Sequence, residues 1–135
     1  MEFEGANASQ KETVLVVEDD CAVNFVVTEA LTRAGYEVLM VDHVEQALTT
    51  AEEHRGHLDL VITDLIMPGM NGRKVAELIC AADPSVRVLF MSGYTEDLLE
   101  EEDADVEDAP FIAKPFTIDQ LLRKVEEVIH PEAVG

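Results

Sequence analysis

Side chains that could together bind a metal ion and a phosphoryl group follow four of the apolar runs in this 135-residue sequence. Carboxylates are ligands for Mg²⁺, and a carboxylate can also act as a nucleophile. A hydroxyl group and an ammonium group can each hold a phosphoryl oxygen. In chain order the residues are Glu18 and Asp19, Asp64, Ser92 and Lys114. This combination predicts phosphoryl transfer to an aspartate, with Asp64 attacking phosphorus in line beside a bound Mg²⁺.

The acidic residues also have simpler structural interpretations. Asp20, directly before a helical pattern, is best explained as a helix N-cap. Three consecutive carboxylates repel one another unless a cation lies between them, so Glu18 and Asp19 favour metal binding. Asp64 could form a turn with its own backbone, but it would face the first pair if their two strands are neighbours. Mg²⁺ is preferred over Ca²⁺ because EF-hand spacing is absent.

Ser92 and Lys114 carry less information when each is taken alone. A serine after a strand is commonly a turn or cap residue, and an isolated lysine is usually a solvated surface charge. Lys114, however, lies between the apolar segments 111–113 and 115–116. Removing its charge from water there requires an anion, which the carboxylates would supply.

The sequence around these residues alternates between strand and helix patterns. Five apolar runs predict strands, at residues 14–17, 36–41, 58–63, 86–91 and 110–113, and those at 14–17 and 58–63 are expected to be buried. Apolar residues at helical spacing predict helices over 23–34, 44–51, 75–82 and 118–129. The alternation predicts an α/β fold: a flavodoxin-like, doubly wound, five-stranded parallel sheet in the order 2-1-3-4-5, with about five helices. Ligands bind such sheets at the carboxyl ends of the strands, where the polar residues stand.

Two segments fit this pattern less simply. Residues 65–72 are rich in proline and glycine and predict a loop. Nine of the 13 residues from 96 to 108 are acidic, where a further helix is expected. Like charges one turn apart weaken a helix, so we predict a short or frayed helix there. The segment is either a solvated stretch or a face that meets a basic partner, and the sequence leaves both open.

The composition narrows the possible partners. Nine Lys and Arg against 29 Asp and Glu give a net charge of −20, which excludes nucleic acid and an anionic membrane surface as direct partners. Basic proteins and cations are expected instead. No apolar run predicts a membrane span and the N-terminal residues lack the features of a secretory signal, so a cytoplasmic location is expected. Cys21 and Cys80 lie within helical patterns and are interpreted as buried or half-buried free thiols.

Four short motifs resemble the receiver domain of bacterial two-component response regulators. They are VLVVEDD at 14–20, TDLIMPGMNG at 63–72, MSGY at 91–94 and KPF at 114–116. The resemblance predicts a receiver domain over residues 12–130, with residues 1–11 as a disordered arm or linker and 131–135 as a C-terminal tail. The motifs are most similar to those of receivers attached to hybrid histidine kinases.

By this resemblance, Asp64 is the phosphoacceptor, and its donor is a phosphohistidine on a histidine kinase or a histidine phosphotransfer protein. Asp19 and Asp64 would bind Mg²⁺ directly, and Ile66 would contribute its backbone carbonyl. Glu18 would act mainly through water. It replaces the more frequent aspartate, so its longer side chain can alter the metal geometry.

The resemblance also implies a conformational switch. Ser92 takes the position of the family's switch hydroxyl, and Phe111 that of the aromatic residue whose rotamer follows phosphorylation. Phe111 lacks the hydroxyl group of the commoner tyrosine, which removes one possible hydrogen bond. Lys114 takes the position of the family's lysine, and the bond between Lys114 and Pro115 is expected to be cis.

The sequence therefore predicts a phospho-acceptor signalling domain of a phosphorelay, which catalyses only its own phosphoryl transfer and autodephosphorylation. Output is expected to pass by contact with a protein partner, because no DNA-binding or enzymatic effector follows residue 130. One alternative is a Mg²⁺-dependent phosphohydrolase with an aspartate nucleophile, which would need a second acid where Ile66 stands. Another is a phosphorylation-independent interaction module. Clustering of the acids is also expected to raise at least one carboxyl pKa in the absence of metal.

Overall fold

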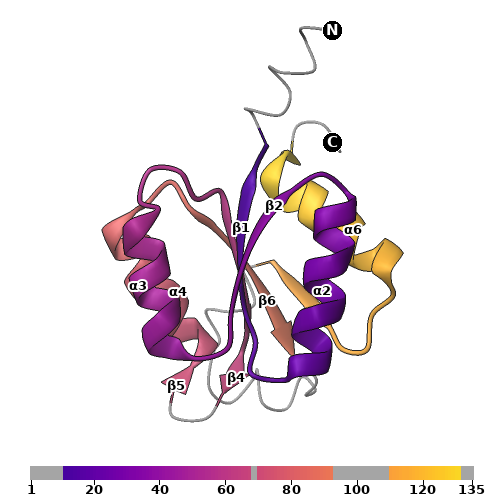
Figure 1. Ribbon diagram of the computed structural model, residues 1–135, viewed down its shortest axis with the longest axis horizontal. Helices are drawn as coiled ribbons and strands as arrows, with labels where there is room; N and C mark the ends of the chain where they lie inside the picture. Colours follow the sequence, from indigo (N-terminus) through magenta and orange to yellow (C-terminus); the bar gives the residue numbers. More distant parts are fainter. Residues whose placement is uncertain (1–10, 68–69, 93–109, 132–135) are drawn as a thin grey trace, which may run out of the picture.

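The computed structural model describes residues 11–67, 70–92 and 110–131 and is built around a five-stranded parallel sheet (Figure 1). The strands of the sheet are β1 Thr13–Val17, β2 Glu37–Val41, β3 Leu60–Asp64, β6 Arg87–Ser92 and β7 Phe111–Ala113. The helices are α2 Cys21–Arg33, α3 Val44–Glu53, α4 Gly72–Ala82 and α6 Ile118–Ile129. The strand order β2-β1-β3-β6-β7 is the predicted order 2-1-3-4-5, so the predicted fold class is confirmed.

The two faces of the sheet carry separate apolar cores, because successive side chains of a strand point to opposite faces. Val14 and Val16 of β1 pack into the core that α2 and α6 cover. Leu15 and Val17 pack into the core that α3 and α4 cover. Figure 1 shows these two pairs of helices on the two sides of the sheet. The continuous apolar run at 14–17 is therefore a strand buried on both faces, as predicted.

Local hydrogen bonds determine where α2 begins. The carboxylate of Asp20 accepts bonds from the backbone N–H groups of Ala22 and Val23, at 3.0 and 3.3 Å, so the predicted N-cap is confirmed. Gly35 follows the helix with φ of +105°, a left-handed conformation that favours glycine. The helix therefore starts just after Glu18 and Asp19, which we call the acid pair, and its N-cap residue Asp20 directly follows that pair.

Two expectations about α2 are wrong in detail. Cys21, predicted to be buried or half-buried, is exposed in the first turn, whereas Cys80 is half-buried as expected. Val26 and Ala34 belong to the apolar residues at helical spacing that predict this helix, but Val26 is 45% exposed and Ala34 is also exposed. The buried stripe runs through Val27 and is narrower than the apolar pattern, because only one side of the helix faces the sheet.

The predicted loop after Asp64 contains two short strands, β4 Ile66–Met67 and β5 Met70–Asn71, which pair antiparallel. Strands of two residues are too short to show an alternating pattern in the sequence, so only the loop was predicted.

Some predictions concern residues outside those that the structure describes. The expected helix in the acidic segment 96–108 lies outside the described residues. Most residues of the two predicted tails, 1–11 and 131–135, lie outside them as well. The domain limits at residues 12 and 130 therefore stay a prediction. Among the described residues, no helix combines the length and the apolar character needed to span a bilayer.

Candidate functional site

The residues predicted to act together stand at one edge of the sheet. Glu18 follows β1, Asp64 is the last residue of β3, Ser92 is the last residue of β6 and Lys114 follows β7. Strands β1, β3, β6 and β7 are consecutive neighbours and all parallel, so their carboxyl ends meet. The topology therefore places side chains that are up to 96 residues apart in the chain at one site.

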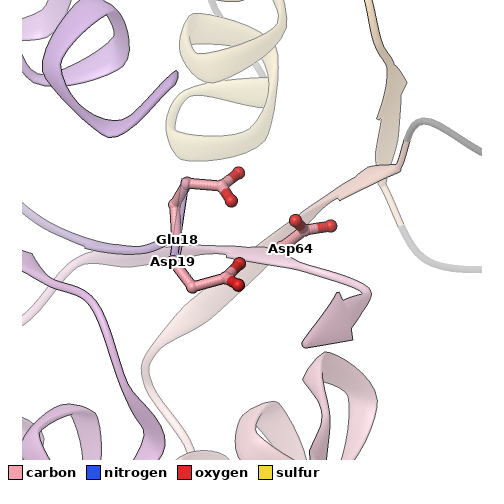
Figure 2. Close-up of side chains that lie close together, drawn as sticks. All are labelled: Glu18, Asp19 and Asp64. Atoms are coloured by element: carbon pink, nitrogen blue, oxygen red, sulfur yellow. The ribbon is translucent and has the colours of Figure 1, made fainter. Parts of the chain in front are cut away.

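Three carboxylates form the centre of this site. Glu18, Asp19 and Asp64 each offer an oxygen atom, and these atoms all lie within 4.8 Å of one another (Figure 2). Glu18 is 1% exposed and Asp64 is 8% exposed, whereas Asp19 is open to solvent. Mg²⁺ prefers oxygen ligands, takes one or two carboxylates and keeps several waters. Asp19 and Asp64 fit this preference as direct ligands, with Glu18 acting through one of the waters.

The ammonium group of Lys114 neutralises part of this negative charge. Its Nζ lies 2.9 Å from Oε1 of Glu18 and 3.1 Å from Oδ2 of Asp64. The predicted pairing of this half-buried lysine with the carboxylates is confirmed. Its backbone N–H donates to the carbonyl of Ser92 at 2.8 Å, and the bond to Pro115 is cis, as expected.

The charges at the site change one another's pKa values. Burial raises the pKa of Glu18 to about 7, and the hydrogen bond from Lys114 opposes this rise without cancelling it. Repulsion by Asp64 adds a smaller upward contribution. Burial alone would lower the pKa of Lys114, but its bonds to Glu18 and Asp64 outweigh burial and raise it. A raised carboxyl pKa was predicted, but its main cause is burial and not the clustering of acids.

Magnesium binding should release protons at about pH 6.5. Glu18, whose pKa of about 7 lies above its ordinary value of 4.5, is largely protonated there, whereas a cation bound beside it favours its charged carboxylate form. In the metal-free protein, the stability that Glu18 contributes is fully present below about pH 4.5 and is lost as the pH rises through about 7. Calorimetric titration in buffers of different ionisation enthalpy would count the protons, and Tm should rise with Mg²⁺.

The control for this titration is Glu18→Gln, which has no carboxyl proton to lose and should release fewer protons on titration. A wild-type titration without proton release and without a thermal shift would contradict the prediction.

Helix α4 begins directly against the backbone of Asp64. The N–H of Gly72 donates to the carbonyl of Leu65 at 2.6 Å. A Cβ atom at Gly72 would overlap the backbone carbonyl of Asp64, so only glycine fits there. Sequence reasoning treated Gly72 as a loop residue and missed this contact. The one available signal was a glycine at the start of a helix. Side chains that cap the helix are more usual near that position, so a glycine there can indicate a close backbone contact.

The remaining predicted residues have positions in the structure, but their roles stay predictions. Ser92 is buried at the end of β6, one residue beyond the Asp64–Met91 pair of the ladder. Phe111 is half-buried at the start of β7 and packs against the small apolar cluster that includes Phe90. Ile66 is the first residue of β4, two positions after Asp64.

The fold and the site together define a class: a phospho-acceptor domain with its acidic centre at the carboxyl edge of a doubly wound sheet. The family model of the response regulator receiver domain matches residues 14–126. The chain belongs to this family. It is therefore a phospho-acceptor signalling domain of two-component systems and not a conventional enzyme.

Individual relatives agree with this assignment. The chain is 33% identical over 124 residues to the sensor kinase CckA of Brucella abortus, covering 92% of this chain and 13% of the kinase. It is 28% identical over 116 residues to the response regulator receiver protein CpdR of the same organism, covering 86% of this chain and 95% of that protein.

Among solved structures, the response regulator TrrA of Thermotoga maritima, in complex with Mg²⁺ and BeF, is similar with a TM-score of 0.73 at 29% identity. The match covers 86% of this chain and 97% of that chain. The chain thus spans almost the whole of the single-domain relatives and a small part of the kinase.

Proposed function

We propose that Asp64 accepts the phosphoryl group, and that the donor is a phosphohistidine on a histidine kinase or a histidine phosphotransfer protein. The observation that carries the proposal is that Asp64 belongs to the carboxylate cluster and also contacts Lys114. A carboxylate oxygen of Asp64 forms a bond to phosphorus as the bond between phosphorus and the imidazole nitrogen breaks. The imidazole leaves with the electron pair and takes a proton from solvent. The product is an acyl phosphate.

The other residues at the edge of the sheet have supporting roles. Asp19 and Asp64, with the backbone carbonyl of Ile66, would hold Mg²⁺ directly, and Glu18 would hold it mainly through water. When bound, Mg²⁺ offsets negative charge on the carboxylates and the phosphoryl oxygens. The ammonium group of Lys114 exchanges its bond to Asp64 for a bond to a phosphoryl oxygen.

The same site would also produce the signal. The hydroxyl group of Ser92 binds another phosphoryl oxygen, and Phe111, three residues before Lys114, changes its rotamer in response. The changed surface is then recognised by a protein partner. The acyl phosphate is removed by water at the same site, which is the autodephosphorylation expected of this domain.

The proposal is tested by incubating the purified protein with acetyl phosphate and separately with a phosphorylated histidine phosphotransfer protein. Both should label the protein in the presence of Mg²⁺ and neither in EDTA. Steady turnover of phosphate esters would instead favour a phosphohydrolase. An unlabelled protein that binds a partner equally well with and without Mg²⁺ would favour an interaction module.

Exposed apolar side chains beside the site suggest where the donor protein docks. Phe25 and Val26 of α2 are 62% and 45% exposed, and Ile118 of α6 is 52% exposed. We name these three residues the α2–α6 face. Val26 lines two grooves, one of about 510 Å³ that also includes Lys114 and one of about 360 Å³ that also includes Ile118. The face is therefore continuous with the lysine that contacts Asp64, which suits a helix carrying the phosphohistidine.

Phe25→Glu should slow phosphotransfer from a histidine phosphotransfer protein about tenfold, because a charged residue replaces an apolar contact at the interface. Labelling by acetyl phosphate should stay unchanged, since this small donor needs no docking surface. Time courses with both donors measure the difference. Met40→Glu adds the same charge at a 54% exposed residue of β2 and should change neither rate. Equal slowing with both donors would show that Phe25 acts on folding and not on docking.

A further inference from the structure

The side chain of Asn24 joins the acid pair to the neighbouring strand. Asn24 lies in the first turns of α2 and is only 4% exposed. Its Nδ2 donates to the backbone carbonyls of Glu18 and Val41, each at 3.0 Å. Its Oδ1 accepts a hydrogen bond from the hydroxyl of Thr28 at 3.1 Å. The two backbone carbonyls can only accept hydrogen bonds, so they fix the Nδ2 end of the amide as the donor.

The amide acts at the point where the strand ladder ends. The last pair of the β1–β2 ladder is Val17 with Val41. Beyond it, the N–H of Glu18 still reaches the carbonyl of Val41, at 3.2 Å. The next backbone acceptor is the carbonyl of Glu18, which the Asn24 amide binds in the interior of the protein. A side chain thus continues the hydrogen bonding of the sheet by one peptide unit.

That peptide unit links the two acids of the candidate magnesium site. The carbonyl bound by Asn24 belongs to the peptide bond between Glu18 and Asp19, so its orientation sets the directions in which both side chains leave the backbone. Glu18 points to Lys114 and accepts a bond from the N–H of Asp20 at 3.0 Å. Asp19 offers its oxygen to the cluster. A rotation of this peptide would separate the two carboxylates.

We infer that Asn24 is a positioning residue for divalent-cation binding, because it holds the Glu18–Asp19 peptide in the orientation that brings the two carboxylates together with Asp64. The inference rests on the proposed role of these acids as metal ligands. It assigns Asn24 no contact with the cation or with phosphate. Groups that orient metal ligands without touching the metal typically change metal affinity by a factor of ten or more when they are removed.

The decisive variant is Asn24→Leu, which has a similar branched shape but no donor. It leaves the buried carbonyl of Glu18 without its amide partner, and the peptide can rotate to find another. Mg²⁺ affinity, measured by calorimetry on the folded protein, should weaken about tenfold. Val27→Ala on the same helix is the matched control: it removes buried apolar contacts and lowers the stability, but the affinity should stay within about twofold of wild type.

Two further variants keep the test informative if Asn24→Leu folds poorly. Asn24→Ser fits without overpacking but is too short to hold both carbonyls, so an intermediate loss of affinity is expected. Thr28→Val keeps the amide and its two donor bonds but removes the hydrogen bond to its Oδ1, so a smaller loss is expected. Urea unfolding of each variant separates stability from affinity.

The outcomes distinguish this inference from the function on which it rests. A wild-type protein that binds no Mg²⁺ would overturn the proposed magnesium site and the inference with it. Normal Mg²⁺ binding by wild type, with unchanged affinity in Asn24→Leu or Asn24→Ser despite reduced stability, would overturn the inference alone and leave Asn24 as a structural residue.

Discussion

Asp64→Asn should abolish labelling by acetyl phosphate, to less than about 1% of the wild-type level. An amide has nearly the same shape as a carboxylate but lacks the nucleophilic oxygen that forms the acyl phosphate. The fold should persist, because Lys114 keeps its bond to Glu18 when the charge of Asp64 is removed. Phosphate incorporation measured by intact-protein mass spectrometry, together with an unchanged circular dichroism spectrum, checks both parts of this prediction.

Two other aspartates serve as controls for this experiment. Asp59, at the opposite end of β3, accepts a bond from the N–H of Thr13 at 2.8 Å, and Asp59→Asn should be labelled like wild type. Asp19→Asn removes a proposed metal ligand but not the nucleophile, so its labelling should be slow and should recover in part as the Mg²⁺ concentration rises. Labelling of Asp64→Asn at the wild-type level would place the acceptor elsewhere in the chain.

Lys114→Met should slow phosphorylation by acetyl phosphate about a hundredfold while Mg²⁺ binds no more weakly than to wild type. The rate falls because the variant lacks the fixed positive charge that would bind a phosphoryl oxygen during transfer. Mg²⁺ binding is not weakened because the ammonium group lies 2.9 and 3.1 Å from two of the proposed metal ligands and repels an incoming cation. Initial rates at saturating Mg²⁺ and calorimetric titrations at about pH 8.5 measure the two effects separately.

The matched control is Lys124→Met, since Lys124 pairs with Glu127 on α6 at 3.3 Å and, in the described part of the chain, forms no ion pair with Glu18, Asp19 or Asp64. It should change neither quantity. Parallel losses of rate and of Mg²⁺ affinity in Lys114→Met would mean that the lysine assembles the carboxylates and does not serve the phosphoryl group.

The fold and the main site residues could be predicted because they depend on patterns that can be recognised in the sequence alone. Strands buried on both faces give continuous apolar runs such as 14–17, and the parallel arrangement brings all their carboxyl ends to one edge. Once that edge was defined, Glu18, Asp64 and Lys114 had to be neighbours. The Asp20 cap was predictable for the same reason, because it involves only adjacent residues.

The remaining features depend on contacts that no local pattern encodes. Asn24 stands in an amphipathic helix, where a polar residue normally indicates the solvent side, yet it is buried against two backbone carbonyls. A glycine such as Gly72 indicates a loop in the sequence, and the sequence does not reveal that the backbone of Asp64 lies against it. The burial of Glu18, and with it the pKa of about 7, depends on how closely the surrounding elements pack.

The contact between Gly72 and the Asp64 carbonyl has a mechanical consequence. There is no room at this contact for even one methyl group, so the main chain of Asp64 and the first turn of α4 cannot approach each other further. A shift of that main chain towards the helix would therefore displace the first turn of α4. Because α4 and α3 share a core, the displacement would be passed on to α3.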